Sequence, residues 1–313
     1  MIGGFFMLTE RKNALFHEYF REWIELYKVG AVREVTLSKY KMTLKRLREI
    51  APDTTMEELD RRMYQRILNE YAINHEKQTT MDFHHQLKGA IVDAVDERLI
   101  LVDPTRKVVV KGKTPSRKKI KYISQFDLQK LLSQLELTEE MTYDWLILLI
   151  AKTGLRFSEA LAVTPKDFNF AYQTLTISKT WNYKDRLGYF QETKNQASKR
   201  VVQLDWKTNM QFAQMIEGLP EEHPFFIKGR VFNSTVNQRL ERHCKKADIP
   251  IISIHGLRHT HASLLLFAGV SIASVARRLG HANMSTTQQI YLHIIQELEN
   301  QDNDKIMRYL SSI

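Results

Sequence analysis

Residues 101–121 read LVDPTRKVVVKGKTPSRKKIK and interrupt an otherwise helical pattern. The stretch holds eight basic residues and one acidic residue, Asp103. Its prolines and its glycine disfavour a helix, so we interpret it as a basic linker that could pass along a phosphate backbone. A solvated hinge that is basic by chance is the alternative. The predicted organisation is a domain over 1–103, a linker over 104–121 and a second domain over 122–313.

Length and composition agree with two domains. The chain has 313 residues, enough for about two domains of ordinary size. Lys and Arg number 46 against 36 Asp and Glu, a formal charge of +10, which favours a polyanionic partner such as nucleic acid. No apolar run approaches the ~20 residues of a membrane-spanning helix, and Cys244 is alone, so an intrachain disulfide and a multi-cysteine zinc site are excluded. We expect a cytoplasmic protein.

Before the linker, apolar residues recur at three- and four-residue steps, which predicts helices. One helix contains Phe16 to Tyr27, Thr36 is expected to cap a second, and two more are expected over about 56–71 and 80–99. Basic side chains on these helices are candidate groove or phosphate contacts, namely Lys39, Lys41, Lys45, Arg46 and Lys88. The linker adds the candidates Lys111, Lys113, Arg117, Lys118 and Lys119.

After the linker, the pattern alternates between helices and short strands. Helices are expected over 124–137, 141–152 and from about 235 onward. Strands are expected over 172–180, 188–193 and 200–204, as two consecutive hairpins. The predicted fold class is therefore multidomain α and α+β: an all-helical N-terminal domain and a mixed domain of mainly helices with a small antiparallel sheet.

Several polar residues after the linker suit chemistry at a phosphate. Arg156 and Glu159 stand three apart, so the carboxylate can hold a guanidinium whose fork fits two phosphate oxygens, although such pairs are also common on helix surfaces. Lys194 ends a strand and could donate a proton, or merely keep a sheet edge soluble. His255 and Arg258 are also three apart and can enter one site.

The remaining histidines raise the question of a metal site. His259 and His261 are two residues apart and therefore point to different helix faces, and no HExxH arrangement exists. We expect no metal. His281 follows an expected turn and could line a pocket, whereas Tyr291, taken alone, has the spacing of a core residue.

In combination, these residues resemble the tyrosine recombinase (phage integrase) family, in particular the integrases of phages and conjugative transposons. The resemblance covers about residues 10–300 and fills every catalytic position of the family pattern. Its motifs are TGLRFSEAL (153–161), TK (193–194), HGLRHTHASLL (255–265), LGHANMSTT (279–287) and QIYLHI (289–294). The larger integrases carry a further arm-site-binding domain, whereas the core-binding pattern begins here near residue 10.

The resemblance implies a role for each motif residue. Tyr291 would attack a scissile DNA phosphate, giving a 3′-phosphotyrosyl bond and a free 5′-hydroxyl. Arg156 and Arg258 would clamp the nonbridging oxygens, and Lys194 would be the general acid for the leaving oxygen. His255 would assist proton movement at the phenol, and His281 would hydrogen-bond the phosphate. Glu159 would orient Arg or His side chains. No metal, ATP or other cofactor is implied.

The resemblance also implies partners. The first partner is double-stranded DNA at specific recombination sites, on which a homo-tetramer would assemble and resolve a Holliday junction. Accessory DNA-bending or excision factors would also take part. The protein would act at the nucleoid, without a membrane partner. Integration or excision of a mobile element is the implied role. A catalytically silent DNA-binding protein, a type IB topoisomerase and a metallohydrolase are the alternatives. The tail after Tyr291, acidic and then apolar over 306–310, would pack on a neighbouring protomer or on its own domain.

Overall fold

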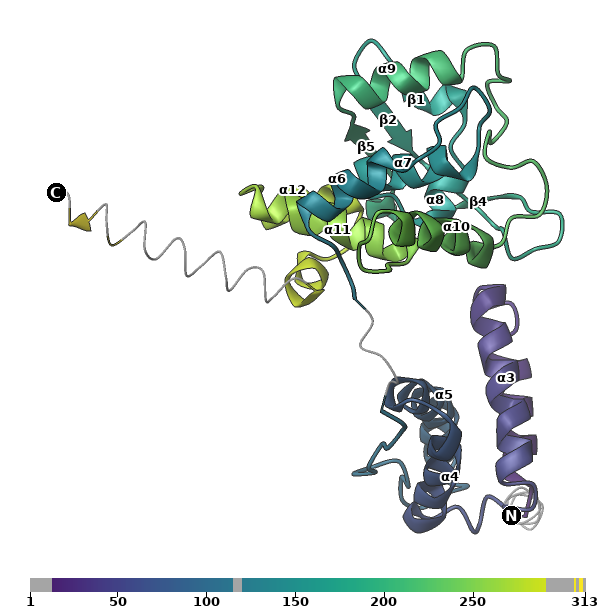
Figure 1. Ribbon diagram of the computed structural model, residues 1–313. Coiled ribbons are helices and arrows are strands. Elements are labelled where there is room, and N and C mark those ends of the chain that lie inside the picture. Colours follow the sequence, from purple (N-terminus) through teal and green to yellow (C-terminus); the bar gives the residue numbers. More distant parts are fainter. Residues whose placement is uncertain (1–12, 115–119, 291–306, 308–309, 312–313) are drawn as a thin grey trace. The chain divides into compact units, whose positions relative to one another are not determined.

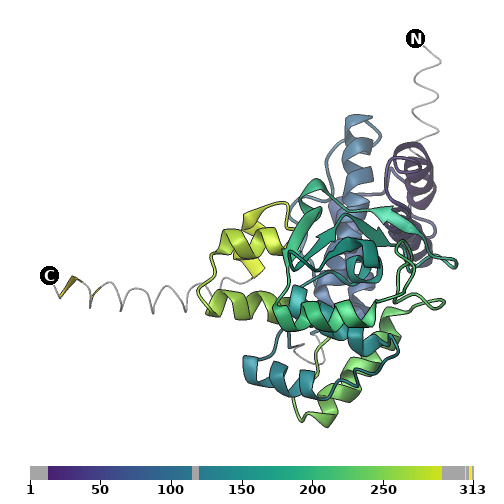
Figure 2. The ribbon, with the colours of Figure 1, turned by 90° about the horizontal axis from the view of Figure 1, so that it is seen from above.

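The computed structural model describes residues 13–114, 120–290, 307 and 310–311 (Figures 1 and 2). The chain divides into two compact units, Met1–Lys118 and Lys119–Ile313. Each unit has its own apolar core. In the part of the chain that the structure describes, no helix has the length and apolar character needed to cross a membrane.

The first unit is helical, as predicted. Its helices are α2 (Phe16–Tyr27), α3 (Glu34–Ile50), α4 (Arg61–Asn74) and α5 (Lys77–Asp96). The regularly spaced apolar residues of all four helices form one core, which includes Phe16, Phe20, Leu47, Tyr64 and Leu87.

Three helix starts in the first unit differ from the prediction, among them that of α5, which begins at Lys77 and not near residue 80. Thr36 does not cap α3; the capping position is Arg33, whose carbonyl accepts from the amides of Thr36 and Leu37. The next helix begins later than expected because the Asp60 side chain accepts from the Met63 amide at 2.7 Å and fixes the start of α4 there.

Residues 104–113, which the sequence pattern assigned to the linker, pack on the first unit. Gln65 donates to the Val109 carbonyl at 2.9 Å and accepts from the Val109 amide at 2.8 Å. Arg61 donates to the Lys107 carbonyl, and the Lys113 amide donates to the His75 carbonyl. Helix α4 and the residue after it thereby pair part of the backbone of this segment, which the charge pattern of the segment did not reveal.

The second unit combines helices with two small sheets (Figure 1). Its helices are α6 (Gln125–Ser133), α7 (Tyr143–Thr153), α8 (Phe157–Leu161), α9 (Trp206–Met215), α10 (Asn233–Lys246), α11 (Ile254–Phe267) and α12 (Ile272–Leu279), with short 3-10 turns η1 (Pro165–Asp167) and η2 (Gln196–Ser198). Its strands are β1 (Phe168–Asn169), β2 (Thr174–Ile177), β3 (Lys179–Trp181), β4 (Phe190–Glu192) and β5 (Arg200–Gln203). These two units confirm the predicted fold class.

The strand pairing differs from two consecutive hairpins. All pairs are antiparallel, but β5 pairs with β2, in register Leu175 to Val202, and forms the sheet β1–β2–β5. Leu175, Ile177 and Val202 are buried on the inner face of this sheet, whereas every residue of β4 is exposed. Burial of apolar side chains therefore selects β5 for the core sheet and leaves β3–β4 as a separate hairpin.

Helix α7 is the centre of the second unit. It is buried almost along its whole length and packs against α11. Its Asp144 is fully buried and accepts from Arg239 Nη2 at 2.9 Å and pairs with His243 Nε2 at 2.9 Å, which holds α10 on α7. The helix ends at Gly154, whose φ of +70° is a left-handed conformation that favours glycine.

Candidate active site

The end of α7 places the first motif residue. After Gly154 the chain turns into α8, and Arg156 occupies the capping position of α8. The Glu159 carboxylate accepts from the Arg156 amide at 3.0 Å and from Arg156 Nη1 at 2.7 Å. The Arg156 side chain is 33% exposed, whereas that of Glu159 is 1% exposed. The buried carboxylate thus orients a guanidinium that still reaches solvent.

Arg258 joins the ends of two helices. Ser253 caps α11 by accepting from the Gly256 amide, and Arg258 lies in the first turns of that helix. Its guanidinium is buried and donates to the Gly154 carbonyl at 2.6 Å and to the Leu279 carbonyl at 2.7 Å. Carbonyls at helix C-termini carry partial negative charge, so they stabilise this buried cation.

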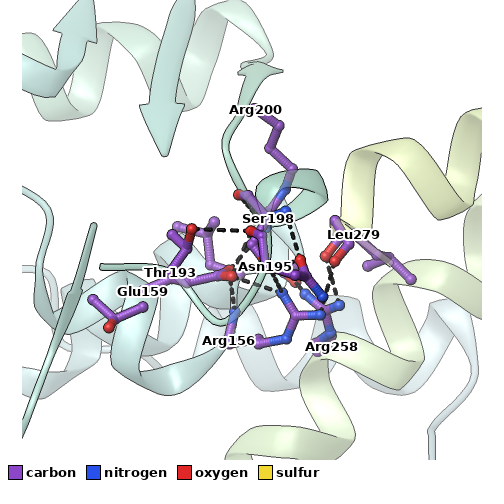
Figure 3. A network of polar contacts seen from close by, with 12 residues as sticks. Arg156, Glu159, Thr193, Asn195, Ser198, Arg200, Arg258 and Leu279 are labelled. Carbon is purple, nitrogen blue, oxygen red and sulfur yellow. Dashed lines mark hydrogen bonds and ion pairs between the residues drawn. The ribbon is translucent and has the colours of Figure 1, made fainter. Parts of the chain in front are cut away.

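The turn between β4 and β5 carries Lys194. Within the turn, Asn195 Oδ1 accepts from the Ser198 amide at 3.0 Å and from Ser198 Oγ at 2.7 Å. Arg156 Nη1 donates to Ser198 Oγ at 3.4 Å, so the turn lies beside the first arginine (Figure 3). Lys194 itself is exposed at this edge.

A third arginine, Arg200, lies under this turn. Its Nη2 pairs with Glu159 Oε2 at 2.9 Å, and its side chain is 4% exposed. Burial raises the pKa of Glu159, but hydrogen bonds and charge from Arg200, together with Arg156, outweigh it and keep the pKa below its ordinary value. Glu159 is therefore a carboxylate at neutral pH. Sequence reasoning missed Arg200, although a signal exists: it lies on the same face of β5 as the buried Val202.

The C-terminal end of α12 and the residues after it also lie at the site. Gly280 has a φ of +66°, and its carbonyl accepts from Arg156 Nη2 at 2.9 Å. His281 follows, with Nδ1 2.8 Å from Thr287 Oγ1. Burial, and then the charges of Arg258 and Arg156, lower the pKa of His281 from 6.5 to about 4. This imidazole is therefore neutral at pH 7.

His255 lies at the start of α11 and is exposed, whereas Arg258 is buried. Its ring meets that of His259 edge to face, with centroids 4.7 Å apart. Partial desolvation, followed by the charges of Arg258 and Arg156, lowers the pKa of His255. A neutral imidazole can accept a proton at pH 7.

His261 has a structural role instead. Its Nε2 accepts from Arg278 Nε at 2.9 Å, so its Nδ1 carries the proton and donates to the Ala151 carbonyl at 3.0 Å. Burial and the charge of Arg278 lower its pKa to about 3. Both nitrogens are thus engaged between α7, α11 and α12.

Some predicted residues lie outside the described part of the chain. These are Tyr291, Arg117, Lys118, Lys119 and most of the tail. The described candidate DNA contacts are exposed on the first unit, on α3, on α5 and on the segment after it, namely Lys39, Lys41, Lys45, Arg46, Lys88, Lys111 and Lys113. Helices α3 and α5 lie together, since Thr43 Oγ1 donates to Gln86 Oε1 at 2.7 Å.

Known proteins are similar to this chain in sequence or in fold. Residues 121–297 match the model of the phage integrase family. The integrase of Staphylococcus phage L54a is 23% identical over 95% of this chain and 94% of its own length. The ICEBs1 integrase of Bacillus subtilis (strain 168) is 24% identical over 68% of this chain and 61% of its own. The Tn1549 transposon integrase in complex with circular intermediate DNA has the same fold, with a TM-score of 0.73 at 17% identity over 88% of this chain and 94% of that chain.

The chain belongs to the phage integrase family. The predicted resemblance to tyrosine recombinases is thereby confirmed, as is the prediction of a tyrosine-type site-specific DNA recombinase.

Proposed function

We propose that this protein cleaves and rejoins DNA at specific sites, in the integration or excision of a mobile element, through a covalent bond between Tyr291 and the 3′-phosphate of the broken strand. The observation that carries the proposal is the convergence of Arg156, Arg258 and the turn with Lys194 at the ends of α7 and α12. The catalytic residues are those that the family pattern assigns.

The cleavage step uses this arrangement as follows. A phenol has a pKa of about 10 and is a weak nucleophile at neutral pH, so it needs a base and a stabilised transition state. His255, neutral at pH 7, accepts the phenolic proton as the Tyr291 oxygen bonds to phosphorus. Arg156 and Arg258 stabilise the charge on the nonbridging oxygens. Lys194 gives a proton to the 5′-oxygen as its bond to phosphorus breaks.

His281 and Glu159 support this step. Because His281 Nδ1 faces Thr287, Nε2 is the atom that would donate to a phosphate oxygen. Glu159 orients Arg156 through two hydrogen bonds. Rejoining is the reverse reaction, with the 5′-hydroxyl of a partner strand attacking the phosphotyrosine. The phosphodiester energy is kept in that bond, so the reaction consumes no ATP.

Partners follow from the chemistry. The first unit presents cations on α3 and α5 to the phosphates of double-stranded DNA at the recombination site. Two exchanges of two strands require four active sites, hence a homo-tetramer on DNA that resolves a Holliday junction. Accessory DNA-bending or excision factors assist at the nucleoid. In support of DNA as the partner, the solved lambda integrase, 16% identical with a TM-score of 0.67, is a dimer bound to a COC′ core site.

Covalent trapping tests the proposal. DNA from the ends of the element that carries the gene is nicked just downstream of the exchange point, so that the short fragment with the new 5′-hydroxyl diffuses away. We expect an adduct that survives detergent, with EDTA present, and that is absent from Tyr291→Phe but retained in the matched variant Tyr309→Phe. The protein should not relax a plasmid that lacks the site.

Three outcomes would contradict the proposal. No adduct with any end sequence would favour a catalytically silent DNA-binding protein. Relaxation of any plasmid would favour a topoisomerase, and loss of cleavage in EDTA would favour a metallohydrolase.

A further inference from the structure

We infer that Arg200 is a positioning residue that fixes the turn carrying Lys194 to the arginine pair of the site. The inference rests on the proposed function, and it concerns a residue outside the catalytic set of the family pattern. Arg200 contacts neither the phosphate nor Tyr291 in this account; it acts through the groups that it holds.

Arg200 joins three parts of the site. Its Nη1 donates to the Ser198 carbonyl at 2.8 Å, in the turn that carries Lys194. Its Nη2 pairs with Glu159, the carboxylate that orients Arg156 (Figure 3). Its Nε donates to the Arg278 carbonyl at 2.6 Å, near the end of α12 and two residues before Gly280.

The turn, Arg200 and the end of α12 are also in close contact. A Cβ atom added to Gly280 would lie 2.8 Å from Arg200 Nη1 and 3.1 Å from the Cα atom of Ser198. Asn195 closes the turn through its two hydrogen bonds with Ser198. A displacement of Arg200 would therefore move the turn, and with it the exposed Lys194.

The charge of Arg200 has a second consequence. Glu159 is shared by Arg200 and Arg156, at 2.9 and 2.7 Å. Without Arg200, the buried carboxylate would have Arg156 as its remaining ion-pair partner and would neutralise a cation that the phosphate needs. Lysine cannot replace the guanidinium, because a single ammonium cannot reach the Ser198, Arg278 and Glu159 oxygens with the geometry of a planar fork.

The experiment compares the rate of adduct formation on two DNA substrates. One has the natural oxygen at the 5′-bridging position of the scissile phosphate and the other has sulfur. A thiolate, with a pKa near 8.5 for its thiol, leaves without a general acid, so the sulfur substrate does not need Lys194. General acids contribute about 10²–10⁴-fold. We expect Lys194→Ala to lose that factor with oxygen and to recover it with sulfur.

For Arg200→Gln we expect the rate of adduct formation on the oxygen substrate to fall about 100-fold, as for a catalytic group displaced by about 1 Å. On the sulfur substrate the rate should clearly recover. Arg200→Lys should behave like Arg200→Gln. Asn195→Ala, a milder change in the turn, should show the same recovery and keeps the test usable if the Arg200 variants do not fold. Arg239→Gln is the matched control, because it breaks an ion pair with the buried Asp144 in the same unit. Its ratio of sulfur to oxygen rates should equal that of the wild type.

An equal loss on both substrates for Arg200→Gln and Asn195→Ala would overturn the inference, because the loss would then not pass through the placement of Lys194. That result differs from failure of the proposed function, in which the wild type itself would form no adduct with either substrate.

Discussion

The two units of the chain place their charges in opposite ways. Among the described residues of the first unit, the buried polar side chains are threonines and His84, and every Asp, Glu, Lys and Arg is at least partly exposed. The second unit buries Asp144, Glu159, Arg200 and Arg258. Exposed charges are screened by salt and are individually replaceable, whereas a buried charge depends on each partner. The first arrangement suits DNA binding, and the second suits catalysis.

The strongest test of this contrast is the removal of a buried cation. Arg258→Ala should lower the rate of adduct formation by about 10²–10³-fold, since one preorganised donor to the transition state is lost. DNA affinity, measured by fluorescence anisotropy, should remain within a few-fold of the wild type. An equal loss of affinity would mean that Arg258 serves docking. The melting temperature reports whether the variant is folded.

Removal of exposed cations should have the opposite signature. Changing Lys39, Lys41, Lys45 and Arg46 together to Gln should weaken DNA binding and flatten its salt dependence, by about 0.9 in log–log slope for each phosphate that the variant no longer neutralises. The adduct rate at saturating DNA should stay unchanged. The control is Lys166→Gln, an exposed cation of the second unit paired with Glu222. An unchanged slope of the salt dependence in the fourfold variant would mean that α3 does not contact DNA phosphates.

Acid should destabilise the second unit through its histidines. The pKa values of His259 and His281 are about 4 in the folded chain, against an ordinary 6.5, mainly through burial. Between these values the unfolded chain binds more protons, so the free energy of unfolding falls as the pH is lowered from 6.5 towards 4. Amide hydrogen exchange at pH 7 and pH 5, corrected for intrinsic rates, should show a greater loss of protection in α11 and α12 than in α3. Equal losses would contradict the assigned environments.

Two glycines in left-handed conformations offer the smallest test. Gly30 in the first unit has a φ of +76° and open space around it, whereas Gly280 has a φ of +66° and Arg200 and Ser198 close by. Gly30→Ala should cost about 1–2 kcal/mol of backbone strain. Gly280→Ala should cost more, measured by urea unfolding, and should also slow adduct formation. Equal costs would mean that the end of α12 is not tightly packed on the turn.

The outcome at particular residues shows what sequence can predict. The helices of the first unit and the Arg156–Glu159 pair could be predicted because apolar spacing and side-chain chemistry are local, whereas helix α9 (Trp206–Met215) has no counterpart in the prediction. The cap of α3 could not be predicted, because threonine is a preferred capping residue and arginine is not, yet the helix begins after Arg33. The pairing of β5 with β2 depends on which strand has an apolar inner face, and the packing of residues 104–113 depends on Gln65, far away in sequence.

Arg200 illustrates the same limit within the site. Its residue type alone suggests a surface cation. Alternation along β5 places it on the inner face with Val202, and the fold shows that it pairs there with Glu159.

The most direct test of the account is to identify the atoms of the covalent bond. The wild-type adduct is digested with trypsin and nuclease, and mass spectrometry then locates the nucleotide on the peptide. We predict a 3′-phosphate esterified to the phenolic oxygen of Tyr291, in the peptide that also contains Gln289 and His293, with a free 5′-hydroxyl on the downstream DNA fragment. A nucleotide on Tyr309 or any other residue, or attachment through a 5′-phosphate, would contradict the account.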